Sequence, residues 1–239
     1  DVDTAGLAET ERALRAEPGA PPGLLLSLHR LDVADREAVA AFPAAVLAAH
    51  PGVDLLVNNA GVAVGGTFEQ VSEADFDWLL GINFWGVVRM TRAFLPVLRR
   101  SDDARIANVS SVFGLVAPAR QVAYASSKFA VRGFSEALRH ELEGSTVGVT
   151  VVHPGGVATA IARNARVPAD APPEEVARRR AAEQRNLRMP PARAGEIIVR
   201  GIERRARRVL VGWDARVLSV LSRVAPVRYW SLLARRVEP

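Results

Sequence analysis

The chain has 239 residues, 49% of them hydrophobic and 24% charged, which is typical of a soluble globular protein with one large domain and room for an appendage. The absence of cysteine excludes disulfides and thiolate metal sites, and no apolar run reaches the roughly 18 residues that a membrane-spanning helix needs. The net charge of +5 is uneven, because residues 1–155 carry −5 and residues 156–239 carry +10. No DNA-binding motif or stacking-aromatic pattern accompanies the basic part, so we interpret it as a solvated helical surface and expect no nucleic-acid partner.

Apolar runs alternate with helical patterns along the chain, which predicts an α/β fold with a parallel sheet wrapped by helices. A strand is expected at residues 24–31 and a helix at 35–49, although Pro43 is awkward inside that helix. The next strand, at residues 53–57, runs into a turn at 58–61. Ser72 and Asp75 resemble a capping box, which predicts a long helix from there to about residue 99.

The second half of the chain continues this series. Strands are expected at residues 105–109 and 147–152, with a helix between them at 124–143 that Gly144 closes. After a proline- and arginine-rich stretch, a helix is expected at 195–205 and a last strand at 208–211. We find no internal repeat and no linker long enough to divide the chain. We therefore assign residues 1–212 to one domain and residues 213–239 to a C-terminal amphipathic arm.

The arm has two interpretations. Asp214 is placed to cap a helix with an apolar face, and a patch with aromatics follows at residues 229–233. Such an arginine-flanked segment can lie on an anionic membrane, or it can dock on its own domain or on a second subunit. We expect docking. The residues of the expected apolar face are Val217, Leu218, Leu221 and Val224.

One lysine is conspicuous, because 30 of the 31 basic residues are arginine and the remaining one is Lys128. A surface position would have tolerated arginine, so this position indicates a need for a compact ammonium. Tyr124 lies four residues earlier on the same expected helix, and the two side chains therefore share a face. The structural alternative is a half-buried tyrosine beside a snorkelling lysine.

This pair would suit proton transfer. An ammonium stabilises a phenolate, so we expect Lys128 to lower the pKa of Tyr124 and make the phenol a usable general acid/base. Ser111, just past an expected strand, is placed to hold a substrate oxygen by hydrogen bonding.

Five motifs together resemble the classical short-chain dehydrogenase/reductases, from Asp1 to about Leu210. Ser111 precedes Tyr124 by 13 residues and follows Asn83 by 28, in agreement with the family. The resemblance implies a Rossmann-type, three-layer α/β/α fold and an NAD(P)-dependent oxidoreductase that interconverts an alcohol and a ketone or aldehyde by hydride transfer. The motifs are Asn58-Asn59-Ala60-Gly61, Asn83 in a long helix, Asn108-Val109-Ser110-Ser111, Tyr124-Ala125-Ser126-Ser127-Lys128 and Pro154-Gly155.

The resemblance also implies catalytic roles. Tyr124 would move a proton to or from the substrate oxygen, and Lys128 would lower its pKa and hold the nicotinamide ribose. Ser111 would polarise the carbonyl. Asn83 would anchor a water that relays protons through Lys128; its structural alternative is a helix-kink residue.

Cofactor contacts are implied at both ends of the dinucleotide. Asp32 and Val33 resemble the pair that contacts adenine, although Asp32 could instead cap a helix. The turn at residues 58–61 would shape the floor beneath the cofactor. Part of its role would be structural, since it fixes the geometry between the strand and the turn. The segment that contains Pro154, Gly155, Val157 and Thr159 would touch the nicotinamide end. The implied cofactor-binding residues are Asp1, Asp32, Val33, Asn58, Ala60, Gly61, Tyr124, Lys128, Pro154, Gly155, Val157 and Thr159.

One family feature is not found in these 239 residues. The family begins with a strand, a T-G-x-x-x-G-x-G loop and a helix, on the order of 30 residues that we expect to precede Asp1. Residues 1–3 resemble the end of the family's second strand, and a helix is expected at 6–17. A carboxylate at Asp1 would accept hydrogen bonds from the adenosine ribose and repel a 2′-phosphate, so we expect NAD rather than NADP.

The remaining expectations concern partners and location. The substrate would be a small alcohol or carbonyl compound. Residues 160–191 correspond to the family's variable substrate lid, and their sequence has no pattern that identifies the substrate. The resemblance favours a homodimer or homotetramer in the cytoplasm, with peripheral membrane contact through the arm as the alternative. A cofactor-free scaffold or regulator on the same fold would account for the missing loop, but it would leave the catalytic set unexplained.

Overall fold

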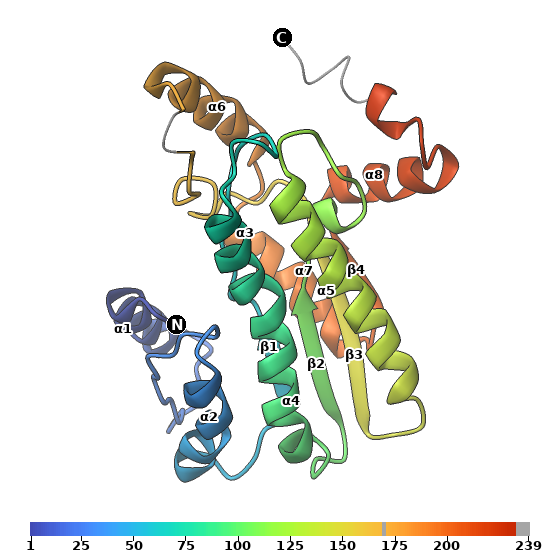
Figure 1. The fold of residues 1–239 in the computed structure, drawn as a ribbon. Coiled ribbons are helices and arrows are strands. Elements are labelled where there is room, and N and C mark those ends of the chain that lie inside the picture. The colour runs from blue at the N-terminus through green and yellow to red at the C-terminus, as the bar shows by residue number, and fades with distance from the viewer. Residues whose placement is uncertain (169–170, 233–239) are drawn as a thin grey trace.

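The centre of the molecule is a four-stranded parallel sheet with the order β1-β2-β3-β4 (Figure 1). The structure is a computed structural model, and it describes residues 1–168 and 171–232. The strands are β1 (Leu55–Asn58), β2 (Ala104–Val109), β3 (Val147–Pro154) and β4 (Arg208–Val211), and each neighbouring pair is parallel. All four strands therefore end at one edge of the sheet, where ligands of open α/β sheets bind.

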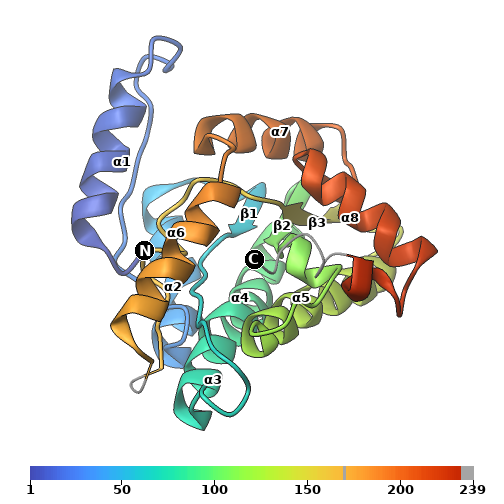
Figure 2. The same cartoon turned by 90° about the horizontal axis from the view of Figure 1, so that it is seen from above.

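Helices cover both faces of this sheet, which confirms the expected α/β fold. Figure 2 shows α4 and α5 on one face and α7 on the other. None of the helices in the described part of the chain is both long and apolar enough to span a membrane. The helices are α1 (Thr4–Ala16), α2 (Arg36–Ala49), α3 (Glu73–Leu80), α4 (Val87–Leu98), α5 (Val122–Glu141), α6 (Pro173–Asn186), α7 (Pro191–Glu203) and α8 (Trp213–Val224).

Two apolar clusters hold the layers together. On the α4 face, Phe94 and Leu98 pack against Ile106 and Val149 of the central strands. On the α7 face, a second cluster is formed by Val152, Ala194, Val209 and Val211. The central strands are buried on both faces, which explains why they read as continuous apolar runs in the sequence.

The expected long helix between residues 72 and 99 is interrupted. Ser72 caps its start as predicted, since its Oγ accepts a hydrogen bond from the Asp75 amide at 3.1 Å. A π-helix (Gly81–Gly86) then separates α3 from α4. π-Helical turns are rare and often mark functional positions. This one carries Asn83 into the interior, where it is fully buried.

The strand expected at residues 24–31 does not form, so that prediction was wrong. Two backbone hydrogen bonds tie this extended segment to the N-terminus, from Leu31 N to Asp1 O at 3.0 Å and from Asp1 N to His29 O at 3.3 Å. A strand needs a longer ladder of such bonds, and no strand of the described residues lies beside this segment. β1 is likewise the edge of the described sheet, and its Leu55 and Val57 are exposed.

The arm docks on its own domain over the described residues, as expected. Ala215 is fully buried, and Leu218 and Tyr229 pack against Val112 of the segment after β2. The Tyr229 hydroxyl also accepts a hydrogen bond from the Ala117 amide at 3.0 Å. Helix α8 is therefore held by both apolar contact and a polar anchor.

Two details of the arm prediction were wrong. Gly212, not Asp214, occupies the N-cap position of α8, because the Asp214 carboxylate is used elsewhere. Val217 and Val224 of the expected apolar face are exposed, since the helix turns Ala215 and Ser219 toward the domain instead. Leu233 and the rest of the arm lie outside the described residues.

Candidate active site

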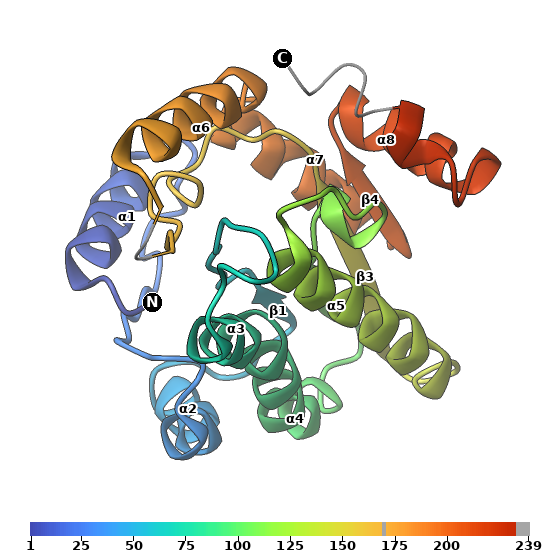
Figure 3. The same ribbon diagram turned by 45° about the horizontal axis from the view of Figure 1, so that its top comes forward.

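Four side chains from three elements meet at the carboxyl edge of the sheet. Ser111 lies two residues after the end of β2, Tyr124 and Lys128 lie in the first turns of α5, and Asn83 comes from the π-helix. Figure 3 shows three segments arranged around this edge: the start of α5, helix α6, and the loop that precedes α3. Asn83, Ser111 and Lys128 are buried, and Tyr124 is half-buried.

Ser111 is held by its backbone and its hydroxyl. It caps a short 3-10 helix (Val112–Gly114), and its Oγ accepts a hydrogen bond from the Phe113 amide at 3.1 Å. Its carbonyl oxygen lies 2.8 Å from Nδ1 of His153, a fully buried residue of β3. A carbonyl only accepts, so Nδ1 carries the proton and His153 is the donor. The position of Ser111 is therefore fixed from the neighbouring strand.

His153 is neutral at physiological pH. Burial lowers the pKa of His153 from 6.5 to about 4, while the hydrogen bond to Ser111 acts in the opposite direction. Its Nε2 is buried and has no hydrogen-bond partner among the described residues. A proton there would place an unpaired charge in the core.

This burial predicts a pH-dependent stability. Between pH 6.5 and pH 4 the unfolded chain binds a proton at His153 and the folded chain does not, so stability falls as the pH falls. We expect a loss of about 2 kcal/mol in the free energy of unfolding between pH 7 and pH 4.5 from this residue alone. Urea titrations at the two pH values measure it in the wild type and in His153→Asn.

His153→Asn should be less stable at pH 7 and should lack this part of the pH dependence. His140→Asn, at an exposed position of α5, is the matched control and should keep the wild-type slope. Equal slopes in the wild type and His153→Asn would contradict the prediction.

Tyr124 and Lys128 share one face of α5, as predicted, but their protonation differs from our expectation. The Lys128 Nζ lies 5.6 Å from the centroid of the Tyr124 ring and donates a hydrogen bond to the Val109 carbonyl at 3.0 Å. Burial raises the pKa of Tyr124 to about 12, and a hydrogen bond from Ser111 lowers it only in part. Burial also lowers the pKa of Lys128 to about 8. The expected lowering of the tyrosine pKa was therefore wrong for this structure: the phenol is protonated at neutral pH.

Asn83 links the turn after β1 to α5. Its Oδ1 accepts a hydrogen bond from Val62 N at 2.8 Å, and its Nδ2 donates to Val62 O at 2.9 Å and to Ser127 Oγ at 3.1 Å. Gly61 fits between this amide and the lysine, because a methyl group there would lie 3.4 Å from Asn83 Oδ1 and 3.5 Å from Lys128 Nζ. Gly61 thus keeps the space between the two polar groups open.

Asn58 is placed differently from its neighbours in the turn. Its side chain is buried and donates hydrogen bonds to Thr91 Oγ1 at 3.1 Å and to Asn108 Oδ1 at 2.8 Å. Asn108 in turn donates to Ser135 of α5 at 2.9 Å. The Asn58 side chain therefore joins β1, α4, β2 and α5 inside the protein, which is the structural task foreseen for this turn.

The segment after β3 is shaped by Asp214, a contact that the sequence reasoning missed. The Gly156 amide donates a hydrogen bond to Asp214 Oδ2 at 2.6 Å, and a side chain at Gly155 would collide with the same carboxylate. Val157 then forms a bridge with Met189, and Thr159 is exposed at the edge of the site. No sequence spacing signals this clamp, because the two ends lie 58 residues apart.

The residues expected at the adenine end lie along the N-terminal part of the chain. The Asp32 carboxylate accepts a hydrogen bond from Ala34 N at 2.8 Å, and Asp35, not Asp32, caps α2. Val33 packs against Gly86, where any side chain would collide with it. Asp1 is exposed, and its carboxylate accepts a hydrogen bond from Asp3 N at 2.9 Å.

The lid segment, residues 160–191, is fastened to the domain. The Arg166 guanidinium lies 3.5 Å from the centroid of the Trp78 ring and forms an ion pair with Asp75 at 2.8 Å, which lowers the pKa of Asp75. Arg120 forms an ion pair with Glu175 at 3.3 Å. The helix α6 inside this segment was not predicted, because its polar sequence has no apolar stripe.

Comparison with known proteins finds a matching family, a similar sequence and similar solved structures. Residues 5–169 match the family described as short chain dehydrogenase. The chain is 43% identical over 242 residues to SadH of Mycobacterium tuberculosis, covering 99% of this chain and 84% of that protein. A crystal structure of a short chain dehydrogenase/reductase from Burkholderia phymatum in complex with NAD superposes with a TM-score of 0.81 at 30% identity, covering 94% of this chain and 82% of that one. A metagenomic short-chain oxidoreductase in complex with NADP gives a TM-score of 0.59 at 34% identity, covering 66% and 69%.

Proposed function

The chain belongs to the short-chain dehydrogenase family of oxidoreductases, and we propose that it interconverts an alcohol and a ketone or aldehyde with Tyr124 as the general acid/base. The observation that carries this proposal is the convergence of Tyr124, Lys128 and Ser111 at the carboxyl edge of the sheet. A protonated phenol beside a buried ammonium and a hydroxyl is suited to giving a proton to a carbonyl oxygen.

The residues fit a nicotinamide cofactor, which is also present in the similar solved structures. The buried Lys128 ammonium has three donors and makes one hydrogen bond within the described residues, so it can still donate to ribose hydroxyls. Gly61 keeps the neighbouring space open, and the exposed Thr159 is available five residues beyond the end of β3. The bound cofactor would supply or accept the hydride.

In the proposed reaction, the residues of this chain handle the proton. In the reducing direction, Tyr124 donates its proton to the substrate oxygen, while the Ser111 hydroxyl donates a hydrogen bond to the same oxygen. The resulting phenolate is stabilised by the positive charge of Lys128. Asn83 holds the turn after β1 next to Lys128, and we propose that it positions the water through which the proton is replaced.

An activity screen tests this function. The protein is incubated with NADH or NADPH and a panel of ketones and aldehydes, and with NAD or NADP and the matching alcohols, while absorbance at 340 nm is followed. Turnover that requires Tyr124 supports the enzyme. Absence of turnover with every pair, from protein that binds cofactor, would favour a scaffold or regulator on the same fold.

We also propose that NAD(H) is preferred to NADP(H), because the Asp1 carboxylate is exposed and accepts only the Asp3 amide hydrogen bond among the described residues. Its carboxylate would bind the ribose hydroxyls and repel a 2′-phosphate. In Asp1→Ala, we expect the ratio of kcat/KM values for the two cofactors to shift toward NADP(H) by roughly tenfold or more, since like charges in contact cost several kcal/mol. A wild-type preference for NADP(H), or a ratio that Asp1→Ala leaves unchanged, would refute this assignment.

A further inference from the structure

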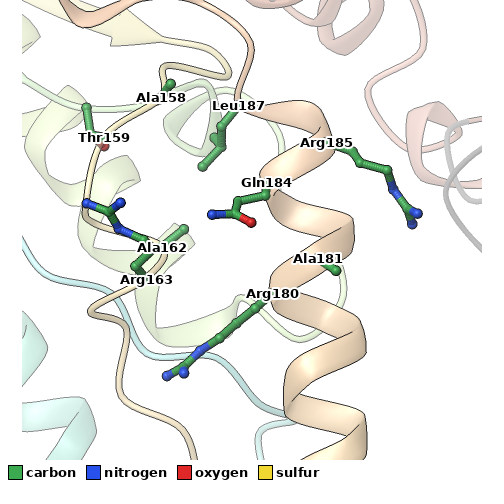
Figure 4. A pocket seen from close by; sticks show the side chains of 9 residues that line it. All are labelled: Ala158, Thr159, Ala162, Arg163, Arg180, Ala181, Gln184, Arg185 and Leu187. Carbon is green, nitrogen blue, oxygen red and sulfur yellow. The ribbon is translucent and has the colours of Figure 1, made fainter.

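A pocket with an unusual charge lies beside the candidate active site. It has a volume of about 850 Å³, and it lies between α6 and the segment that follows β3 (Figure 4). Among the lining residues whose side chains the structure describes, three are arginines and none is acidic. The residues that line it are Ala158, Thr159, Ala162, Arg163, Arg180, Ala181, Gln184, Arg185 and Leu187.

Two of the arginines come from opposite walls. Figure 4 shows Arg163 on the wall formed by residues 158–163, and Arg180 reaching from α6 toward that wall, whereas Arg185 points away from the space. Among the residues that the structure describes, no carboxylate forms an ion pair with Arg163 or Arg180, whereas Arg166 of the lid segment is paired with Asp75. Two unpaired guanidiniums that line one pocket can hold an anion, because each can donate two parallel hydrogen bonds to carboxylate or phosphate oxygens.

The other lining residues indicate the kind of molecule to which the anionic group is attached. Alanines and Leu187 provide an apolar surface in the same pocket as the arginines, and the volume suits a small organic molecule. Thr159 lines the pocket and lies five residues beyond Pro154, which ends β3, so it is at most roughly 17 Å from the end of that strand. A ligand can therefore extend from the Ser111–Tyr124 edge into this pocket.

We propose that the pocket binds an anionic group of the substrate, a carboxylate or a phosphate attached to an apolar body whose other end carries the reacting carbonyl or alcohol. This inference rests on the proposed function, since it specifies the substrate class of the same site. The unequal charge of the chain supports it, because the strongly basic part of the sequence supplies all three arginines.

Binding of simple probes tests the proposal without turnover. Isothermal titration calorimetry on the NAD-saturated full chain compares octanoate and octyl phosphate with octanol, which has the same apolar chain and no charge. We expect at least one of the anions to bind about tenfold more tightly than octanol, or better, with a preference that weakens as salt rises. Whichever anion binds better identifies the group as carboxylate or phosphate.

Arg163→Met combined with Arg180→Met should abolish the preference, while Arg185→Met, on the same helix but directed away, should retain it. All three side chains are exposed, so the melting temperature should not change and serves as the folding control. Equal binding of the anions and octanol, or no measurable binding of either anion, would overturn the proposal. So would a loss of NAD affinity in the double variant, which would assign the arginines to the cofactor's phosphates.

These outcomes separate this inference from the proposed function. An enzyme that turns over neutral carbonyl compounds without any anion preference would overturn the pocket assignment alone. A protein that binds octanoate through Arg163 and Arg180 but shows no turnover with any substrate would overturn the oxidoreductase mechanism and leave the anion site standing.

Discussion

Replacing Tyr124 by phenylalanine should lower kcat for carbonyl reduction by roughly 10²–10⁴-fold, the range typical for loss of a general acid. The ring stays in place, so its edge contact with Phe113 and the packing around Ala123 are retained. What is lost is the proton, which burial keeps on the phenol by raising the pKa of Tyr124 to about 12. Steady-state kinetics with saturating cofactor measure the change.

Tyr229→Phe is the matched control, because the chain has only two tyrosines. The hydroxyl of Tyr229, which lies on the arm, accepts a hydrogen bond from Ala117 N, so this variant should lose about 0.5–1.5 kcal/mol of stability and keep its activity. A Tyr124→Phe variant with near wild-type turnover would show that the phenol is not the proton donor.

The central strands of the sheet were predictable because they are buried on both faces and therefore read as apolar runs. β2, β3 and β4 were each expected within two residues of their observed limits, and the capping residue Ser72 was identified from its side-chain chemistry. Residues 24–31 show where this reasoning fails. Their apolar composition predicts a strand, but strands are defined by hydrogen bonds to a neighbour, and the sequence of one segment does not contain its neighbour.

The site was predictable to the extent that it is local in sequence. Tyr124 and Lys128 share a helical face, and Ser111 lies just past the end of β2, so their proximity follows from spacing and topology. His153 and Asp214 could not be found in this way. Their importance comes from contacts with Ser111 and Gly156 across 42 and 58 residues, and nothing in their own neighbourhood signals it.

The tyrosine pKa illustrates a different limit. Spacing correctly placed the ammonium beside the phenol, but it gave no measure of burial. The structure shows that desolvation outweighs the other influences on both groups, raising the pKa of Tyr124 and lowering that of Lys128. The sign of a pKa shift depends on how much water the fold removes, which is a property of the packed molecule.

The second large effect is expected for substitutions of Lys128, and the pH dependence of the reduction rate is the measurement that tests it. Lys128→Met should lower kcat for reduction by roughly 10²–10³-fold, the loss typical when one preorganised electrostatic donor is removed. In the wild type, burial lowers the pKa of Lys128 to about 8, so the ammonium is present below that pH and is lost above it. The rate of reduction should therefore fall as the pH rises through about 8.

Lys128→Arg separates charge from shape. It keeps a positive charge at every accessible pH, so the fall near pH 8 should disappear in this variant as it does in Lys128→Met. Its activity should still be severely reduced, because a planar guanidinium must occupy the buried space next to Gly61 and Asn83 that a compact ammonium fills. Circular dichroism and melting temperature verify that each variant is folded. A folded Lys128→Arg enzyme with wild-type kcat, or a Lys128→Met enzyme that retains the fall near pH 8, would assign the proton chemistry to another group.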